Sequence, residues 1–373
     1  MAERILLSTP HMSQEGYELQ YIQDAFQKNW IAPLGENVNE FEKSIGAYLG
    51  DGYPVALSAG TAALHLAMIL AGVGAGDKVF CQSLTFSASA NPTAYLGATP
   101  VFIDSDRETW NMDPAALERA FELHGIPKAV VVVHLYGVPA KMAEITAICE
   151  KYNVPLIEDA AEALGSEYQG KKCGTFGTYG VLSFNGNKII TTSGGGMLIC
   201  QNQADAKHAL KLATQAREPF PWYQHEEIGY NYRLSNISAG IGRGQMKVLL
   251  LRIQKKRQIF QRYQEKLAGL PIEFQPEPDG SASNRWLTTI LLDRGCGIAP
   301  SQVLDALNQE NIEGRPVWKP MHLQPVFSGC PYVTAGAASV SDDLFARGVC
   351  LPSDTKMTME DVDRVCDCIR KVF

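Results

Sequence analysis

The sequence of 373 residues lacks the cysteine spacing of a metal site, although it contains nine cysteines. They form no Cys-x-x-Cys pair, and no neighbouring His or Cys completes a zinc-type spacing around Cys366 and Cys368. We therefore assign no metal. An odd number of scattered cysteines in a long chain indicates reduced, mostly buried thiols, which are typical of a cytoplasmic protein.

Long apolar runs and an excess of positive charge are also absent. No stretch approaches the roughly 18 uninterrupted apolar residues of a membrane helix. Residues 1–12 do not combine a charged start with a long apolar segment, so we expect no membrane span and no secretory signal. The net charge of −7 and the pI of about 5.6 disfavour a nucleic-acid-binding surface. We interpret the densest basic cluster, RIQKKR (252–257), as a solvated helix face.

From residue 54 onward, short apolar runs alternate with helical patterns such as TAALHLAMIL (61–70). Strands about 25 residues apart, with helices between them, are typical of βα units in a mostly parallel sheet. A run such as VVVV fits a strand that is buried on both faces. The predicted strands are 54–57, 78–81, 100–104, 129–136, 154–159, 179–184 and 196–200.

The pattern changes in the last third of the chain. A long helical pattern follows RLSN (233–236) and runs to about residue 269. After it come a predicted strand at 285–292 and predicted helices at 301–312 and 357–373. We therefore predict an N-terminal arm and a large domain over residues 1–250, and a smaller α+β domain over residues 251–373.

Two candidate binding features lie at the ends of predicted strands, where ligands gather in open α/β sheets. SAGTAALH (58–65) is a small, flexible turn that opens a helix, so its free N–H groups and Thr61 suit a phosphate. The alternative is a plain helix N-cap, since Ser and Thr begin many helices. IEDAAEALG (157–165) ends a buried strand with Asp159, a carboxylate that could meet a protonated ring nitrogen. Glu162 would lie on the same side one helical turn later. The alternative is an acid that stabilises a helix N-terminus.

Lys188 is the third feature, in the stretch FNGNKIITTSGGGMLI (184–199). It could be an ordinary solvated loop lysine. Desolvation, however, favours the neutral amine, which can form a Schiff base with an aldehyde. Ser183 offers a hydroxyl near the same strand end.

Taken together, these features describe one ligand. A phosphate cradle, an acid for a ring nitrogen and an amine for an aldehyde are what pyridoxal phosphate requires. The acid keeps the ring nitrogen protonated, and the released lysine can carry a proton to and from the substrate. This chemistry predicts a transamination.

Seven motifs along the chain resemble the sugar-nucleotide aminotransferases of the DegT/DnrJ/EryC1/StrS family. The motifs are SAGTAALHLA, TFSASANP, HLYGVPAKM, EDAAEALGS, the SF…K stretch with GGG, GYNYRLSN and RPVWKPMH. The resemblance implies an α/β protein of the aspartate aminotransferase fold (PLP fold type I). Its large domain would carry a mostly parallel sheet of the seven-stranded type, beside a smaller α+β C-terminal domain. NGNKIITTSGGGM and EDAAEALGS are most similar to the C4-aminotransferases that act on a UDP-linked 4-keto-6-deoxy-N-acetylhexosamine in bacillosamine-type glycan biosynthesis.

The resemblance also implies roles for individual residues. Lys188 would be the catalytic lysine that binds the cofactor, and Asp159 the partner of the pyridine nitrogen. Phe86 would stack on the cofactor ring, where core packing is the alternative. Asn231 would reach the phosphate of the neighbouring subunit, which makes a homodimer the smallest active unit. Phosphate binding would fall to Gly60, Thr61 and Ser183.

Glu162 departs from the pattern of many relatives, which carry an amide or a histidine near the cofactor's ring oxygen. A carboxylate would be repelled by the phenolate there. We therefore predict that Glu162 is protonated or shares a proton with the cofactor.

The substrates are inferred from the same resemblance. L-glutamate would donate the amino group, and the acceptor would be a nucleotide-linked keto sugar. A GDP-linked 4-keto sugar or a C3 ketone stays open, as does a regulatory protein that binds a sugar nucleotide without turnover. Relatives that dehydrate sugars replace the lysine, which Lys188 argues against. The predicted substrate-binding residues are Trp30, Pro33, Arg315, Trp318, Lys319 and His322.

Overall fold

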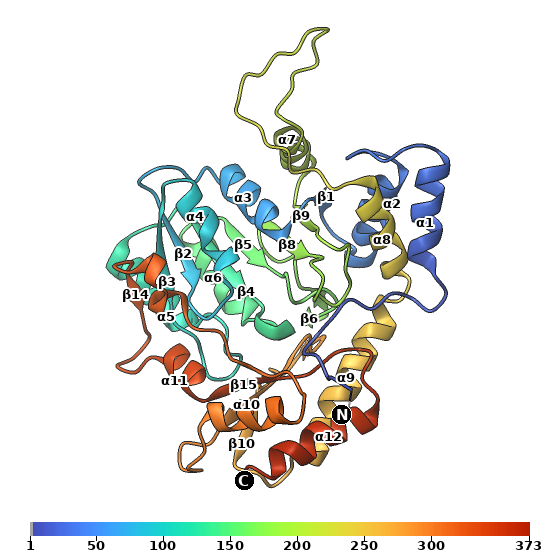
Figure 1. Cartoon of the computed structure of the whole chain (residues 1–373). Coiled ribbons are helices and arrows are strands. Elements are labelled where there is room, and N and C mark those ends of the chain that lie inside the picture. The colour runs from blue at the N-terminus through green and yellow to red at the C-terminus, as the bar shows by residue number, and fades with distance from the viewer. Residues whose placement is uncertain (1–2) are drawn as a thin grey trace.

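The computed structural model describes residues 3–373 and is built around one large sheet with helices on both faces (Figure 1). Five neighbouring strand pairs of this sheet are parallel and two, β1–β9 and β9–β8, are antiparallel. The fold is therefore the mostly parallel α/β architecture that the sequence predicts. The strands, in spatial order, are β1 (Tyr53–Leu57), β9 (Gly196–Cys200), β8 (Tyr179–Ser183), β5 (Leu156–Asp159), β4 (Ala129–Val133), β2 (Lys78–Gln82), β3 (Thr99–Ile103) and β14 (Tyr332–Val333).

Seven of these strands coincide with the seven predicted apolar runs, and each is buried because helices cover both faces. In β4, Val131 packs in the cluster that includes Leu64 of α3, whereas Val130 and Val132 pack against Ile145 of α6. Successive side chains of a strand point to opposite faces, so a strand between two helix layers has to be apolar throughout. The covering helices are α3 (Gly60–Leu70), α4 (Asn91–Tyr95), α5 (Pro114–His124), α6 (Met142–Lys151) and α7 (Gln203–Ala213).

A second, four-stranded antiparallel sheet lies at the other end of the molecule (Figure 1). It packs against α9 (Leu249–Lys266), α10 and α12 through a separate apolar cluster that includes Ile290, Val303 and Val365. The division at residues 250 and 251 stays a prediction, and β14 returns from the later segment to pair with β3 in the main sheet. The elements are β10 (Ile272–Phe274), β12 (Thr288–Leu292), β15 (Gly348–Leu351), β13 (Arg315–Pro316), α10 (Pro300–Gln309), α11 (Val340–Arg347) and α12 (Met359–Arg370).

The helical pattern predicted from residue 233 to about 269 is two helices, α8 (Asn236–Met246) and α9 (Leu249–Lys266). The amides of Lys247 and Val248 bond to carbonyls three residues earlier, which ends α8. A side chain at Gly244 would meet the backbone of Glu18, so α8 can pack closely on α1 (Tyr17–Gln27). Beside them lies α2 (Glu36–Leu49).

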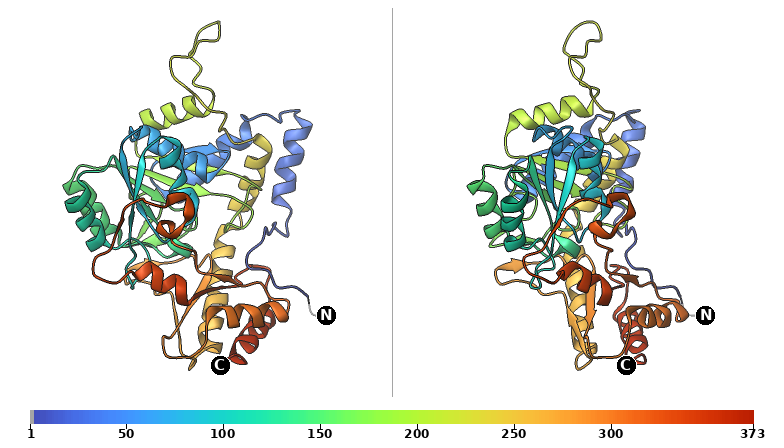
Figure 2. Two further views of the ribbon diagram at one scale, coloured as in Figure 1. Left: turned by 60° about the vertical axis from the view of Figure 1, so that its left-hand side comes forward. Right: turned by 90° about the vertical axis from the view of Figure 1, so that its left-hand side faces the viewer.

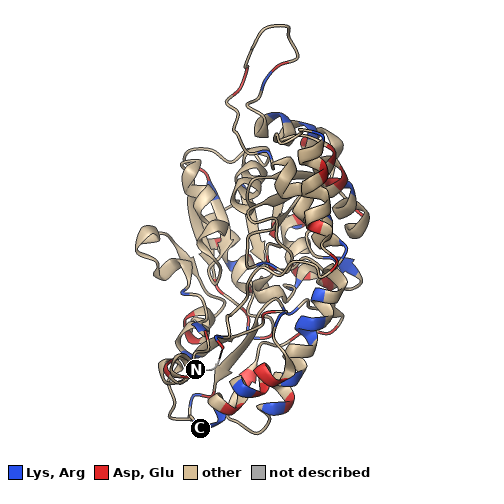
Figure 3. Ribbon diagram, turned by 45° about the vertical axis from the view of Figure 1, so that its right-hand side comes forward, with Lys and Arg blue, Asp and Glu red and all other residues tan. Residues whose placement is uncertain are grey.

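The basic cluster of residues 252–257 lies on α9 and is not entirely a solvated face. Lys256 is only 2 % exposed, because its amine donates to the carbonyls of Trp286 and Ser353. Both acidic and basic residues occur along the helices near the C-terminus (Figure 3). Within the described residues, no helix is long and apolar enough to cross a membrane.

Two further segments matter for the site. Residues 214–231 form a long loop that projects from the body next to α7 (Figure 2). Its outgoing and returning segments are joined by isolated antiparallel β-bridges between Thr214 and Asn231 and between Arg217 and His225. The N-terminal arm runs to the C-terminal part of the chain, where Ile5 pairs with Ile312 in the segment between α10 and β13. A small sheet of β11 (Ser281–Ala282), β6 (Glu167–Tyr168) and β7 (Lys171–Lys172) completes the strands.

Candidate active site

A cavity of about 230 Å³ opens at the carboxyl ends of β5 and β8, beside the first turn of α3. Ligands of open α/β folds bind at this edge of the sheet. Eight residues that the sequence singles out line this one cavity: Gly60, Thr61, Phe86, Asp159, Glu162, Ser183, Lys188 and Trp318.

The first turn of α3 forms one end of the cavity. Its N-cap residue is Ala59, whose methyl group cannot cap the first N–H groups of the helix. Gly60 lies so close to β8 that an added Cβ would be 3.2 Å from the Cβ of Ser183. The backbone N–H groups and the hydroxyls of Thr61 and Ser183 therefore border the same space, which suits an anion.

Asp159 ends β5 and is 5 % exposed. One carboxylate oxygen accepts the Ser89 hydroxyl at 2.6 Å, and the other accepts the Ala161 amide at 3.2 Å. Burial raises the pKa of this carboxyl group above its usual value, while the bond from Ser89 opposes the rise. A cationic ring nitrogen in the cavity would offset the cost of keeping the carboxylate charged. Sequence reasoning did not single out Ser89, which is one of several hydroxyls in TFSASANP.

Lys188 and Glu162 lie next to each other in the cavity wall. The Lys188 Nζ atom is 3.5 Å from Oε1 of Glu162, and the two side chains are 12 % and 4 % exposed. Burial raises the pKa of Glu162 to about 7, and the nearby Lys188 charge opposes this rise. The other oxygen of Glu162 accepts the amide of Tyr136 at 2.7 Å. The ring of Trp286 lies on another side of the amine, with its centroid 4.3 Å from Nζ.

Aromatic side chains form a further wall of the cavity. Phe86 is 59 % exposed and meets Trp318 edge to face at 5.2 Å, so it is not a core residue. Trp318 is fixed in turn by its amide, which donates to the Tyr136 hydroxyl at 3.1 Å. An exposed ring at this position is available to cover a flat ligand.

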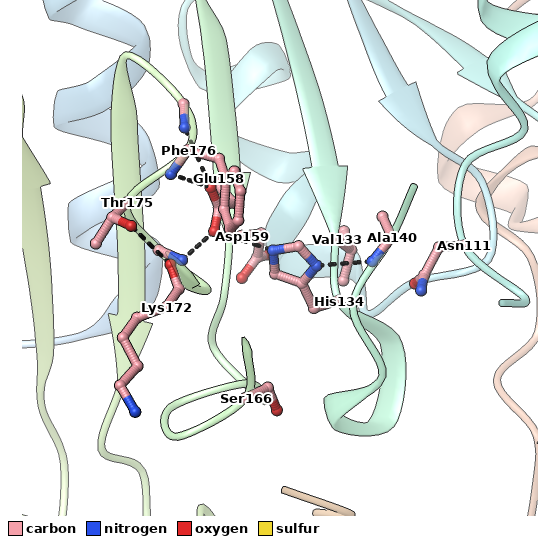
Figure 4. Close-up of polar contacts among 12 residues, drawn as sticks. Asn111, Val133, His134, Ala140, Glu158, Asp159, Ser166, Lys172, Thr175 and Phe176 are labelled. Carbon is pink, nitrogen blue, oxygen red and sulfur yellow. Dashed lines mark hydrogen bonds and ion pairs between the residues drawn. The ribbon is translucent and has the colours of Figure 1, made fainter. Parts of the chain in front are cut away.

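Behind Asp159, the preceding residue Glu158 is fully buried and points to the opposite side of β5 (Figure 4). Its carboxylate accepts N–H groups of Gly174, Phe176 and Gly177, and lies 3.0 Å from Nε2 of His134. His134 Nδ1 accepts the Ala140 amide, so the ring is neutral and donates its Nε2 proton to Glu158.

Cys173 completes a buried group with His134 and Glu158, whose candidate ligand atoms lie within 4.8 Å of one another. Both ring nitrogens of His134 are already engaged in the hydrogen bonds just described. We therefore interpret this group as the support that fixes the end of β5, and with it the place of Asp159.

The remaining predicted residues lie outside this cavity. Asn231 is exposed at the base of the projecting loop, and Trp30 lines a different hollow with Asn236. His322 stacks on Tyr332 at 3.6 Å, and its Nδ1 atom is 2.7 Å from the Ser83 hydroxyl oxygen. Pro33, Arg315 and Lys319 are exposed on the surface.

The cavity thus combines an anion-binding helix end, an exposed aromatic ring, a buried carboxylate and a lysine amine. These groups match the phosphate, ring, ring nitrogen and aldehyde of pyridoxal phosphate, one group to each part of the cofactor. Fold and site together define a pyridoxal phosphate-dependent aminotransferase of the aspartate aminotransferase fold.

Comparison with known proteins places the chain more narrowly. It belongs to the DegT/DnrJ/EryC1/StrS aminotransferase family, whose model matches residues 13–370. It is 52 % identical over 100 % of its length, and 97 % of the relative's, to EpsN of Bacillus subtilis strain 168, which bears the name of a pyridoxal phosphate-dependent aminotransferase. It is also 36 % identical to the GDP-perosamine synthase of Caulobacter vibrioides, covering 99 % of this chain and 98 % of that one.

Among solved structures, the aminotransferase TlmJ from Streptoalloteichus hindustanus superposes with a TM-score of 0.90. The two sequences are 28 % identical, and the match covers 99 % of each chain. The prediction of a sugar aminotransferase of this family is therefore confirmed, as is its cofactor, pyridoxal phosphate.

Proposed function

We propose that this sugar aminotransferase transfers the amino group of L-glutamate to the C4 ketone of a UDP-linked 4-keto-6-deoxy-N-acetylhexosamine. The product would be a UDP-linked 4-amino sugar for bacillosamine-type glycan biosynthesis. The observation that carries the aminotransfer is the meeting of Lys188, Asp159 and the first turn of α3 at one cavity. The choice of sugar rests on the resemblance of NGNKIITTSGGGM and EDAAEALGS.

A GDP-linked 4-keto sugar is the second candidate. It is favoured by the 36 % identity to a GDP-perosamine synthase over almost the whole chain. Both candidates present a C4 ketone, so they differ in the nucleotide and in the substituents of the sugar. A direct comparison of the two acceptors therefore decides between them.

The cofactor, when bound, supplies a ring that draws electrons from the carbon bearing the substrate's amino group. Lys188 takes the proton from that carbon on its Nζ atom and returns a proton in the second half of the reaction. Asp159 would hold the proton on the ring nitrogen. The N-terminus of α3, with Thr61 and Ser183, would bind the phosphate, and Phe86 would cover the ring. The walls formed by Trp286 and Trp318 reduce the access of water to the amine.

Glu162 supports this arrangement through its protonation. With a pKa raised to about 7, it carries a proton in part of the molecules at neutral pH. A protonated carboxyl group can donate to the cofactor's ring oxygen, which an ionised one cannot. This supports the prediction that Glu162 is protonated or shares a proton there.

We further propose a cytoplasmic homodimer in which Asn231 reaches the phosphate of the other subunit. The projecting loop next to α7 carries the exposed side chains Phe220, Trp222, Tyr223 and Ile228, at 39 % to 82 % exposure. Apolar side chains on an extended loop favour contact with another chain. The nine free cysteines, seven of them buried, favour a reducing compartment. The substrate contacts of Trp30, Pro33, Arg315, Lys319 and His322 stay predictions.

The experiment that tests the proposal is an absorbance spectrum of the protein with pyridoxal phosphate, before and after L-glutamate. We expect a visible band that Lys188→Ala lacks and that glutamate abolishes. The UDP- and GDP-linked keto sugars are then compared for their ability to restore the band. A band that glutamate leaves unchanged would refute glutamate as donor, and restoration by the GDP sugar alone would refute the UDP substrate.

A further inference from the structure

We propose that Trp286 is a positioning residue for Lys188, because its indole N–H holds the loop that carries the lysine while its ring lies against the amine. The inference rests on the proposed function, in which the Lys188 amine acts as a base. A base that moves protons to and from one carbon atom has to stay in one place when it is not bound to the cofactor.

Two contacts join Trp286 to the lysine loop. Its Nε1–H donates to the carbonyl of Asn187 at 2.8 Å, one residue before Lys188. Its ring centroid lies 4.3 Å from Nζ of Lys188, within the range of a cation–π contact. With Glu162 at 3.5 Å, the amine lies between a carboxyl group and an aromatic face. Both neighbours favour a defined position of the amine over a spread of rotamers.

Trp286 can act as a fixed point because it is itself held. It is 2 % exposed, and its amide donates to Oδ1 of Asn284 at 2.8 Å. Its carbonyl accepts the buried amine of Lys256 at 2.8 Å. The Asn284 side chain also donates to the carbonyl of Glu162 at 2.8 Å. One asparagine therefore links the two groups that flank Lys188.

The chain supplies a matched control at the same carbonyl. The Ser8 hydroxyl also donates to the Asn187 carbonyl, at 3.0 Å, but no ring contact accompanies it. Ser8→Ala thus removes one hydrogen bond to the loop and nothing from the amine. Trp286→Phe removes the other hydrogen bond but keeps a ring. Trp286→Leu removes both the hydrogen bond and the ring.

Two measurements report on the position of the Lys188 amine. In the first, pyridoxal phosphate is added to cofactor-free protein, and the rate at which the visible band appears is followed. In the second, cofactor-free protein is treated with acetic anhydride, and mass spectrometry gives the acetylation of Lys188 relative to that of exposed Lys43. The second measurement does not depend on the cofactor or on activity.

We expect Trp286→Leu to slow the appearance of the band about tenfold, because an amine that is free to adopt several rotamers less often meets the aldehyde in the reactive geometry. Its Lys188 should be acetylated severalfold faster than in the unaltered protein. Trp286→Phe should slow the band about threefold, the effect of one hydrogen bond. Ser8→Ala should stay within about twofold in both measurements, because its hydrogen bond is exposed to water whereas that of Trp286 is partly buried.

Unaltered band kinetics and labelling in folded Trp286→Leu would overturn the proposal. An equal decrease in the rate of band appearance in Trp286→Phe and Trp286→Leu would also overturn it, because the aromatic ring would then not help to position the amine. If Trp286→Leu does not fold, Trp286→Phe decides alone, since a wild-type rate contradicts the role of the indole N–H. Failure of the unaltered protein to form any band would instead refute the proposed function, and acetylation would still test the position of Lys188.

Discussion

Glu162 is the residue on which the pH dependence of the site should turn. Its pKa is raised to about 7 by burial, so it is mostly protonated below pH 7 and mostly ionised above it. We expect the visible band of the Lys188-bound cofactor to titrate with a midpoint near 7, because the charge beside the ring oxygen changes there. In Glu162→Gln, this transition should vanish between pH 6 and 8.

The measurement is an absorbance titration of both proteins, with Glu150→Gln, an exposed position on α6, as the control. The control should titrate like the unaltered protein. Identical titrations of Glu162→Gln and the unaltered protein would contradict the predicted protonation of Glu162.

Lys256 should make stability depend on pH in the opposite sense to a salt-bridged lysine. Burial lowers its pKa to about 7, whereas the amine of an unfolded chain keeps its proton up to about pH 10.4. Between these values the unfolded state binds more protons, so the stability rises with pH. Between pH 7.5 and 9, the free energy of unfolding should rise by about 1 to 2 kcal/mol more in the unaltered protein than in Lys256→Met.

Urea unfolding of the cofactor-free protein at several pH values measures this difference. Lys255→Met changes the neighbouring, partly exposed lysine and should leave the slope of stability against pH unaltered. A slope that Lys256→Met does not change would show that the buried amine keeps its proton in the folded state.

At the scale of single elements, the first turn of α3 should determine cofactor affinity. Thr61→Val removes a hydroxyl donor to the phosphate but leaves the helix in place. Hydrogen bonds to charged groups are worth about 1.5 to 3 kcal/mol, so the dissociation constant of pyridoxal phosphate should rise at least about tenfold. Thr146→Val, in α6 on the other face of the sheet, should leave it unchanged.

Equilibrium dialysis of the cofactor against each variant gives these constants. Unaltered affinity in Thr61→Val would show that the backbone N–H groups alone hold the phosphate. That result would remove Thr61 from the predicted phosphate site and leave the role of α3 intact.

The elements also show how far sequence reasoning reaches. Seven of the eight strands of the main sheet could be predicted because burial on both faces makes each one a continuous apolar run, as in β4. Lys188 and Asp159 could be predicted because their chemistry is rare at strand ends. The break between α8 and α9 could not be predicted. It depends on the amides of Lys247 and Val248, which donate hydrogen bonds to carbonyls three residues earlier.

The residues whose role sequence reasoning did not predict share one feature. Lys256 satisfies its amine with carbonyls that lie 30 and 97 residues away, so no local pattern marks it as buried. Trp286 approaches Lys188 from a segment 98 residues further along the chain, and its sequence context is that of an ordinary strand start. Contacts between residues so far apart in the sequence leave no local pattern, so they can be recognised only in the folded structure.

At the scale of the whole molecule, shared active sites predict complementation between inactive chains. If Asn231 serves the partner's site, a mixed dimer of Lys188→Ala and Asn231→Ala chains contains one intact site and one doubly altered site. Random assortment should therefore restore about a quarter of the sites. Activity after co-expression of the two chains measures this, and sedimentation equilibrium gives the oligomeric state.

The control is Lys188→Ala co-expressed with a chain that carries both substitutions, which cannot form an intact site. Activity of the first mixture no higher than the mean of its two parents would contradict the sharing of sites, whatever the oligomeric state.

The pairing of Ile5 with Ile312 also bears on how the chain is made. The amide of Leu7 bonds to Glu313, 306 residues further on, so the arm cannot dock until the ribosome has made that later segment. At 5 to 20 residues per second this is a wait on the order of 15 to 60 s. Seven of the eight strands of the large sheet end by Cys200, the last residue of β9, so these seven can pair during the wait, whereas β14 joins them only later. A chain cut short before residue 312 would therefore leave Ile5, which is 5 % exposed in the folded protein, without its pairing partner.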